Sequence, residues 1–580
     1  MGCFVNIDVV INQIMENRQK NIGRSLVVYL GSAWVFIEAL NFLIDKYYWN
    51  SGVLDILILL IIFGLPAMFI YLWFDRKFTK KAIILHSVNI VITLAVISFS
   101  IINPNRINPS QIRLINFQNE QKKLAGSVRS LAILPFSNIT GTEDNVPLVS
   151  GLHDALISEF GQIGGIRVIS TTSTLAYANS QKSVKSIASE LKVDAIIETS
   201  VLSVDNGIRI QVKLINAVPE LVLWTQTFDS RLDNIMGLYG QIISNIAKQI
   251  HLALSPDEQN VLGNSELVNP EAYKAYLEGN YQSKRLSAEG FQLALENYQR
   301  SIDLDSTYAP AYAGMAFAWI AGLQMRQASV TEAIPQIYNN NLKALLLDPN
   351  HPEAHYNEAL MSFQGEWDWS KSEAAFRKAI ALDPSHVLAH AYFGHLLLIE
   401  KRFDEAIHEL DLALEMDPKN HLVLSLYAVV LWHYGEVDQA VELAKKTLDI
   451  NPDNGLIYII LESVNFQKGD FAASMEMLKI KHERELEDFD SVIKEYEGNG
   501  YESAIIKLIE LLQEQTMVQS LNIALYYNRV GKYEEAISWL ERAYTNHDPN
   551  MPYAFLPAEL NNLKSDPRYA AIAQKMNLPL

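Results

Sequence analysis

Asp348-Pro349, Asp383-Pro384, Asp417-Pro418 and Asn451-Pro452 stand almost one period apart in the second half of this chain of 580 residues. Their prolines are separated by 35, 34 and 34 residues. Proline has no backbone N–H and clashes with the preceding turn, so a helix that approaches it must end there. Each dipeptide therefore marks a helix end, and the spacing predicts a repeated helix–turn–helix unit.

A period of 34 residues is typical of the tetratricopeptide repeat, and small residues recur where its helices would cross closely. We therefore predict an all-α solenoid of seven or eight repeats over residues 269–580, after a linker at 255–268, with atypical repeats at its ends. The predicted crossing residues are Ala359, Gly394 and Ala428 on first helices, Ala406, Ala413 and Ala440 on second helices, and Gly435 in a turn.

In proteins with this repeat, fixed positions of the first helices line a concave groove. Here these positions are mostly apolar or aromatic and lack the Lys, Arg and Asn set that would clamp a carboxylate terminus. The expected guest is an extended hydrophobic peptide or a packed helix of a protein partner. Alternatively, a neighbouring domain or a terminal helix already fills the groove. The candidate protein-binding residues are Tyr356, Leu360, Phe363, Leu388, Ala391, His395, Leu398, Leu422, Ser425, Val429, Trp432, Ile459 and Phe466.

Charge and cysteine content exclude several classes of function. Of the 47 basic and 66 acidic side chains, 26 and 48 lie after residue 255, so the repeats would repel nucleic acid. The single cysteine, Cys3, excludes an internal disulfide and cysteine-based zinc sites. The pairs His351/His355 and His386/His390 have helical spacing, but they lie one repeat apart, which repeat ancestry explains. We predict no metal and no cofactor.

Three apolar runs at the start of the chain have the length of membrane spans. They are Ser25–Ile44, Val53–Phe74 and Ala82–Ile102. A helix needs about 20 apolar residues to cross a hydrocarbon core of roughly 30 Å. The sequence thus predicts a short cytoplasmic tail over residues 1–24, three transmembrane helices within 25–102 and a linker at 103–128.

Basic residues in the short loops set the predicted orientation. The loop at 75–81 is rich in Lys and Arg, whereas the loop at 45–52 holds only Lys46. By the positive-inside rule, the chain would be a multi-pass protein of the inner membrane with its soluble domains on the periplasmic side. Glu38 and Asp55 lie within or at the start of predicted spans, and the sequence leaves their role open.

Residues 129–254 alternate between strand and helix patterns in the order β-α-β-α-β-β-β-α. Residues 130–136 form a β-rich apolar run, Val146–Gly161 has helical periodicity, and Asp205-Asn206-Gly207 is typical of a hairpin turn. This order predicts a mixed sheet with helices packed against it. The expected fold class is therefore multidomain: a three-helix transmembrane segment, an α/β domain and an all-α solenoid.

Several segments of the middle region, taken in their order along the chain, resemble the TolB-like amino-terminal domain of bacterial envelope and regulatory proteins. They are Ala132-Ile-Leu-Pro-Phe136, Gly151-Leu-His-Asp-Ala-Leu156, Arg167-Val-Ile-Ser170 and Ala195-Ile-Ile-Glu-Thr-Ser-Val201. The resemblance implies a non-catalytic interaction module.

The repeat region has marks of the same kind. Glu271–Gly279, Tyr308–Gly314 and Leu563–Tyr569 look like bacterial proteins that join a TolB-like domain to these repeats. In such relatives a nucleotidyl cyclase or a DNA-binding domain often precedes the membrane unit. The 24 residues before the first predicted span are too few for either domain.

Motifs of catalysis are missing from the sequence. Gly161-Gln-Ile-Gly-Gly165 lacks both the Lys-Ser/Thr of a Walker loop and the spacing of a dinucleotide fingerprint. His153 and Asp154 are adjacent, so on a helix they point in different directions. We expect no enzyme, but a membrane-anchored scaffold or sensor of the bacterial envelope that binds protein partners. The alternative is the sensory half of a transmembrane regulator that acts through a separate cytoplasmic cyclase or DNA-binding partner.

Overall fold

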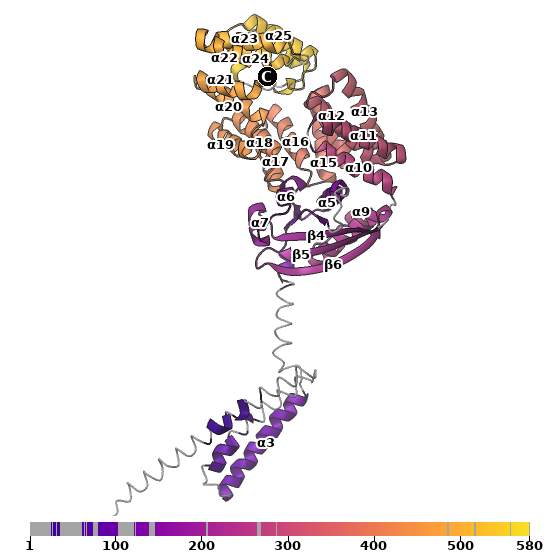
Figure 1. The fold of residues 1–580 in the computed structure, drawn as a ribbon, viewed down its shortest axis with the longest axis vertical. Helices are drawn as coiled ribbons and strands as arrows, with labels where there is room; N and C mark the ends of the chain where they lie inside the picture. Colours follow the sequence, from indigo (N-terminus) through magenta and orange to yellow (C-terminus); the bar gives the residue numbers. More distant parts are fainter. Residues whose placement is uncertain are drawn as a thin grey trace, which may run out of the picture. The chain divides into compact units, whose positions relative to one another are not determined.

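The computed structural model describes residues 79–102, 123–138 and 146–578, with gaps at 205–206, 264–267, 286, 484–485, 516–517 and 557, and scattered positions before residue 73. The chain divides into two compact units, Met1–Gln121 and Lys122–Leu580. Figure 1 shows the helices and strands in sequence colours.

In the first unit, the helix α3 spans Lys80–Ile102. Polar side chains recur along it. The hydroxyls of Ser87 and Thr93 donate hydrogen bonds to backbone carbonyls one turn earlier, 2.9 and 2.7 Å away. Of the helices that the structure describes, none combines the length and the hydropathy that a membrane crossing requires.

The predicted three-helix transmembrane segment is therefore wrong for the described part of the chain, and so is the multi-pass location in the inner membrane that followed from it. Apolar composition alone suggested the third span, but His86 and Asn89 interrupt its apolar run. The first two predicted spans, Ser25–Ile44 and Val53–Phe74, lie largely outside the described residues.

The second unit begins with a mixed six-stranded sheet. The strand order is β3-β1-β4-β5-β6, and β2 pairs with β4. β1 runs parallel to β3 and β4, whereas β4, β5 and β6 pair antiparallel. β4 and β5 form the predicted hairpin, since their ladder begins with Val204 opposite Gly207. The strands are β1 Ser130–Ile133, β2 Ser137–Asn138, β3 Arg167–Val168, β4 Ala195–Val204, β5 Gly207–Asn216 and β6 Leu221–Arg231.

Helices cover both faces of the parallel part of this sheet. Successive side chains of a strand point to opposite faces. Leu131 and Ile133 of β1 accordingly pack in the core that includes α5 (Val146–Gly161) and α8 (Ile235–Gln249). Ala132 packs in a smaller core on the other side with α7 (Val184–Leu191). The alternating residues of the strand thus face helices on both sides, and the domain has three layers: helices, sheet and helices.

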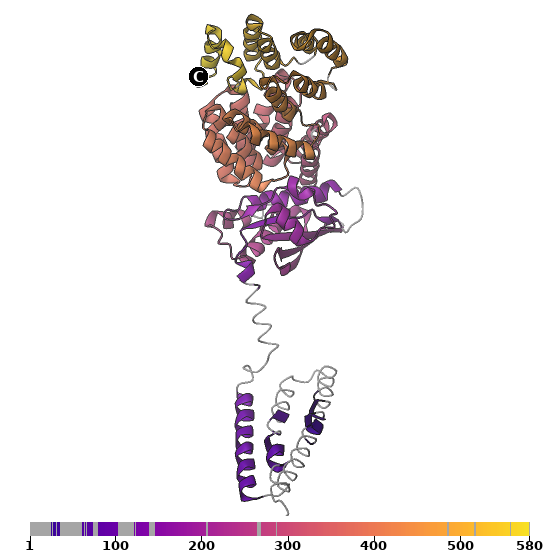
Figure 2. The same cartoon turned by 90° about the vertical axis from the view of Figure 1, so that its left-hand side faces the viewer.

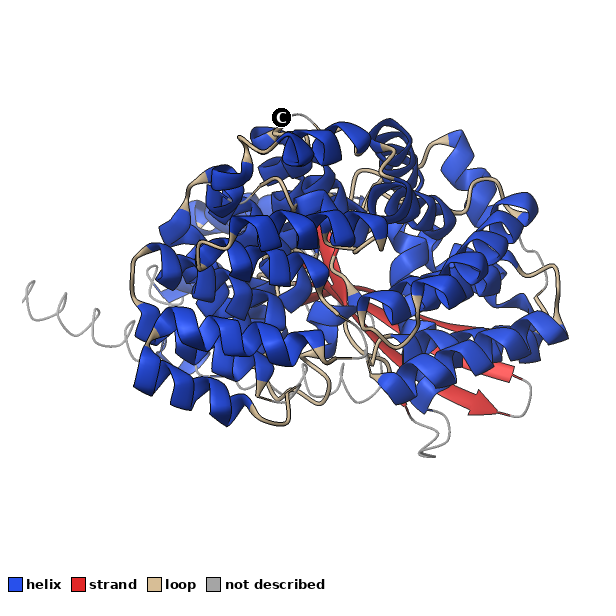
Figure 3. Ribbon diagram, turned by 90° about the horizontal axis from the view of Figure 1, so that it is seen from above, coloured by secondary structure: helices blue, strands red, loops and turns tan. Residues whose placement is uncertain are grey.

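Eight consecutive helical hairpins follow in the described residues, after the short helix α9 (Pro256–Gly263). Seen from above, they follow a curved path (Figure 3). The hairpins are α10 Pro270–Ser283 with α11 Ala288–Leu304, α12 Ala309–Gln324 with α13 Val330–Leu347, α14 Pro352–Leu360 with α15 Trp369–Leu382, α16 Val387–Ile399 with α17 Phe403–Met416, α18 His421–Tyr434 with α19 Val437–Ile450, α20 Gly455–Gln467 with α21 Phe471–His482, α22 Phe489–Asn499 with α23 Tyr501–Gln513, and α24 Ser520–Arg529 with α25 Tyr533–Thr545.

The four dipeptides end helices as predicted. Asp348, Asp383, Asp417 and Asn451 are the carboxyl-terminal caps of α13, α15, α17 and α19. The predicted crossing residues are also confirmed. Their alanines are fully buried, and a side chain at Gly394 would lie 3.0 Å from Leu410 Cγ of the partner helix.

The one spacing of 35 residues has a structural counterpart. α14 continues into a π-helical turn, η4, over Met361–Glu366, and the next residue, Trp367, has a φ of 55°. A π-turn accommodates one extra residue in a helix. The insertion therefore lies in the turn of this repeat, and it places Trp367 just before α15 and Trp369 at the first residue of α15.

The chain ends with a segment that does not continue the repeat. It contains η5 (Met551–Tyr553), η6 (Ala558–Leu563) and α26 (Pro567–Lys575). We call residues 547–578 the C-terminal segment. The two side views place the end of the chain against the helices of the solenoid (Figures 1 and 2).

Candidate protein-binding groove

The predicted groove residues lie on the first helices α14, α16, α18 and α20, and in η4. Five of them are partly exposed: Leu388, Leu422, Trp432, Ile459 and Phe466. The other eight are buried: Tyr356, Leu360, Phe363, Ala391, His395, Leu398, Ser425 and Val429. Neighbouring helices bury some of them, since Phe376 and Tyr392 pack against Tyr356.

The C-terminal segment covers Phe363 and His395. The ring of Tyr553 packs edge-on against Phe363, with centroids 6.1 Å apart, and against His395, at 5.5 Å. Its hydroxyl lies 2.9 Å from His395 Nδ1. Met551, Ala554 and several later apolar residues of this segment belong to the same hydrophobic core as the groove residues. The chain's own C-terminal segment therefore occupies the groove at Phe363 and His395, and the groove residues as a binding site stay a prediction.

The hydrogen bonds of His395 define its tautomer. Nε2 lies 2.9 Å from the carbonyl oxygen of Leu426, which only accepts, so Nε2 carries the proton. Nδ1 is then the acceptor for the hydroxyl of Tyr553. Burial lowers the pKa of His395 to about 4, against the opposing effect of the Leu426 carbonyl. Burial also raises the pKa of Tyr553 well above its usual range. Donor and acceptor are therefore both neutral at physiological pH.

The turn after the π-helix holds the two ends of the C-terminal segment. Trp369 Nε1 donates a 2.8 Å hydrogen bond to the carbonyl oxygen of Met576. Trp367 stacks on His547 with ring centroids 4.7 Å apart and an interplanar angle of 17°. Sequence reasoning missed these contacts. The 35-residue spacing and the apolar run Met551–Phe555 after the last repeat were the available signals.

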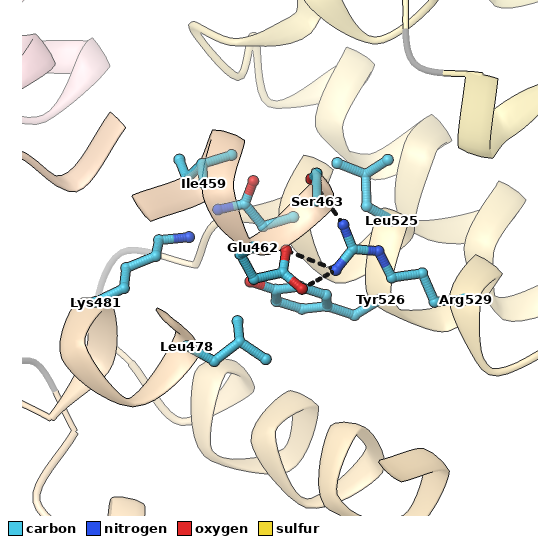
Figure 4. A pocket seen from close by; sticks show the side chains of 9 residues that line it. Ile459, Glu462, Ser463, Leu478, Lys481, Leu525, Tyr526 and Arg529 are labelled. Carbon is cyan, nitrogen blue, oxygen red and sulfur yellow. Dashed lines mark hydrogen bonds and ion pairs between the residues drawn. The ribbon is translucent and has the colours of Figure 1, made fainter. Parts of the chain in front are cut away.

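At the end of the groove formed by α20, polar side chains lie beside the apolar residues Ile459 and Phe466. Arg529 Nη1 lies 2.7 Å from both carboxylate oxygens of Glu462, and Nη2 donates to Ser463 Oγ at 2.9 Å (Figure 4). The guanidinium lies 4.5 Å from the ring of Phe466. Ile459 lines the same pocket, whose volume is about 30 Å³. That space suits about two water molecules, so it does not offer a small-molecule site.

The α/β domain contacts a different surface of the solenoid, the loops at the Asp-Pro turns. Ser173 Oγ donates to Asp417 Oδ1 at 2.5 Å and accepts from the backbone N–H of Lys419 at 2.9 Å. The N–H of Ser170 donates to the carbonyl of Met416 at 2.9 Å. These three bonds join α6 (Thr171–Leu175) and its cap to the turn that ends α17.

A partly buried acidic residue also lies at this contact. Burial and the nearby charge of Asp383 raise the pKa of Glu159 on α5 to about 7. Burial also raises the pKa of Asp383. Gly161 lies beside the same turn, since a side chain there would meet Ser385 at 3.0 Å. The contact between the α/β domain and the solenoid is thus polar and titratable.

Three of the four histidines that had suggested a metal site, His355, His386 and His390, have protein partners, whereas the buried Nδ1 of His351 has no hydrogen-bond partner among the described residues. His386 Nε2 lies 3.0 Å from Glu353, and His390 Nδ1 lies 2.6 Å from Glu409. Within the described residues, no cluster of three or more His, Cys, Asp or Glu could hold a metal ion. His153 Nε2 bonds to the carbonyl of Ile133, whereas neighbouring Asp154 accepts from Thr171. The two side chains therefore do not act together.

Family models match two regions of the chain. Residues 127–246 match the second domain of HilA/YgeH-like transcriptional regulators. Residues 368–421, 397–464 and 521–546 match tetratricopeptide repeats. The solenoid is therefore a tetratricopeptide-repeat structure, of a kind that serves protein–protein interaction and is generally non-catalytic. The resemblance of residues 129–254 to a TolB-like domain stays a prediction.

Relatives among characterised proteins cover part of the chain. "Putative adenylate cyclase 3" of Rhizobium meliloti is 25% identical over 232 residues, which is 40% of each chain. The transcriptional regulator HilA of Salmonella typhimurium is 21% identical over 50% of this chain and 51% of its own. This chain thus spans about half or less of these relatives. YrrB, described as a tetratricopeptide-repeat protein with an unusual peptide-binding site, has 22% identity and a TM-score of 0.22 over 32% of this chain and 89% of its own.

Proposed function

We propose that this chain is a non-catalytic protein-interaction module whose groove binds an apolar, aromatic-containing segment of a partner protein. One observation carries the proposal: the groove already holds a side chain of that chemistry, the chain's own Tyr553, against Phe363 and His395. A surface that buries a tyrosine and satisfies its hydroxyl has the features of a peptide-recognition site.

The partly exposed groove residues offer the first contact to a partner. Leu388, Leu422 and Trp432 lie on consecutive first helices, next to the buried part of the groove. A tryptophan such as Trp432 is typical of the residues that dominate binding energy, and the two leucines add apolar surface beside it. In this proposal residues 129–254 and 269–580 act together, because the polar contacts at Asp417 fix the α/β domain against the solenoid.

Affinity purification with the full chain tests this function. The Trp432→Ala variant should lose partners that crosslink to the wild-type chain, since it removes an accessible groove aromatic. The matched control is Tyr533→Ala, which removes an aromatic side chain that is 48% exposed on a second helix. Retention of the same partners by both variants, or their loss from both, would contradict binding through the groove.

A second candidate function is regulation of a signalling output. The specific observation in its favour is that the matched segments belong to a cyclase-type and a HilA-type regulator. In this version the groove ligand is part of a separate cyclase or DNA-binding protein. Such a protein should be enriched with the wild-type chain and not with Trp432→Ala. Partners without any such output domain would count against this version and leave the interaction function intact.

A further inference from the structure

The contact between the groove and the C-terminal segment differs from the contacts between neighbouring repeats. Each repeat packs on the next through helices, whereas this segment meets the groove through one short 3₁₀ turn, η5, beside η4, and through the carbonyl of Met576; η6 packs on α24 and α25 of the last hairpin. Tyr553 and His395 are 158 residues apart in the chain. The segment therefore returns to a repeat far upstream of the one it follows.

We propose that the C-terminal segment competes with partner proteins for the groove. Trp367 and Trp369 hold the segment in place, and the segment excludes a partner until it is released. The partner that displaces it presents the same chemistry, a short apolar stretch with a side chain that donates a hydrogen bond to His395. This inference rests on the proposed function, because it names the ligand chemistry of the same groove.

The geometry of His395 determines what a competing segment must carry. Its Nε2–H is committed to Leu426, so Nδ1 offers only a lone pair inside an apolar wall. An apolar ligand without a donor would leave this nitrogen buried without a partner, which is unfavourable. A tyrosine satisfies it and packs edge-on against Phe363. The groove thus selects a hydroxyl-bearing aromatic residue over phenylalanine.

The inserted residue in the third hairpin creates the element that retains the segment. The π-turn and the positive φ of Trp367 turn its indole onto His547, and the indole N–H of Trp369 reaches Met576. These two contacts grip the segment at its two ends, on either side of Tyr553. Repeats of the ordinary 34-residue length have no such turn in the described chain.

Tethering explains how such a segment can exclude a partner and still be released. A flexibly tethered ligand has an effective concentration in the millimolar range, so it competes even when its own affinity is modest. The 3₁₀ turns have poorer hydrogen-bond geometry than α-helices, and segments of this kind open more readily than packed helices. A partner with a better-fitting segment can therefore take the place of residues 551–576.

A synthetic peptide of residues 548–560, labelled with a fluorophore, tests the proposal with the full chain. Fluorescence anisotropy should show at least tenfold tighter binding to the Tyr553→Ala chain than to the wild-type chain. The Tyr533→Ala chain is the matched control and should behave as wild type. A peptide with Tyr553→Phe should bind the Tyr553→Ala chain several-fold more weakly than the natural peptide.

Further variants separate release from misfolding. Trp369→Phe keeps an aromatic ring, although a smaller one, and removes the indole N–H that donates to Met576, so it should increase peptide binding less than Tyr553→Ala does. If Tyr553→Ala does not fold, as judged by its thermal transition, the Tyr553→Phe chain takes its place with a smaller expected increase. Equal peptide binding by wild type and by the folded variants, or none by any, would overturn the competitor role. The proposed function would survive that result if Trp432→Ala still loses partners.

Discussion

The solenoid is covered in two places, and the two contacts differ in kind. In the groove, the C-terminal segment packs aromatic rings and makes one neutral hydrogen bond between Tyr553 and His395. At the Asp-Pro turns, the α/β domain contributes hydroxyl and carboxyl groups, among them Ser173 and Glu159. An apolar contact can be reproduced by another apolar segment, whereas a buried acidic contact responds to pH. The groove is therefore suited to exchanging one apolar segment for another, whereas the Asp-Pro turns attach the α/β domain to the solenoid.

The largest expected effect is on the groove side. Phe363 is fully buried between Trp369 and Tyr553. The substitution Phe363→Ala should lower the free energy of unfolding by about 3–5 kcal/mol, since it removes a buried ring and leaves a cavity. Chemical denaturation of the full chain measures this. The control Leu342→Ala, at a position 60% exposed, should change it by less than about 0.5 kcal/mol. Equal losses would contradict the buried groove.

The acidic contact should make the free energy of unfolding depend on pH. The pKa of Glu159 is raised from 4.5 to about 7, so the folded chain holds this proton more tightly than the unfolded chain. Stability from this group is present below pH 4.5 and is lost as pH rises through 7, by on the order of 3 kcal/mol.

The Glu159→Gln variant should flatten that dependence. Without the ionising group, it should be more stable than the wild type at pH 8 and nearly equal to it at pH 5. Thermal unfolding at both values measures the difference. A wild-type stability that does not fall between pH 5 and pH 8, relative to the variant, would contradict the burial of Glu159 at this contact.

A smaller effect is expected for the hydrogen bonds between the two domains. Ser173→Ala removes a donor to the buried carboxylate of Asp417 and an acceptor for the N–H of Lys419. Hydrogen bonds to charged groups contribute about 1.5–3 kcal/mol, so we expect a loss of about 2 kcal/mol. Thr227→Ala, on the exposed face of β6, is the control and should be neutral. A neutral Ser173→Ala would show that α6 does not hold the solenoid.

The smallest effect should come from the hydroxyl of Tyr553. Tyr553→Phe keeps the ring against Phe363 and removes only the donor to His395, so it should cost about 1 kcal/mol. Equilibrium denaturation resolves such a difference when the dependence of the unfolding free energy on denaturant concentration is the same for both chains. The same substitution in the His395→Ala background should cost less, because the bond is already absent there. An equal cost in both backgrounds would contradict the pairing of these two side chains.

Local patterns in the sequence predicted local structure. The Asp-Pro dipeptides indicated the helix ends because proline acts within one turn, and the small residues marked helix crossings such as Gly394 against Leu410. The filling of the groove had no local signal, since it joins Tyr553 to residues nearly two hundred positions earlier. The spacing of 35 did record the insertion at Trp367, but not its contact with His547. The apolar start of the chain misled, because a run such as 82–102 was judged by its length while His86 and Asn89 interrupt it.

Site-specific photocrosslinking can show whether Tyr553 of the C-terminal segment occupies the groove. A photoreactive p-benzoylphenylalanine would replace Tyr553 in the full chain, with the same replacement at Tyr533 as control. After irradiation and proteolysis, we expect intramolecular crosslinks from position 553 to Met361–Glu366 or to Val387–Ile399, which hold Phe363 and His395. The control should give none to these segments. Crosslinks from position 553 that avoid both segments would contradict the self-occupied groove.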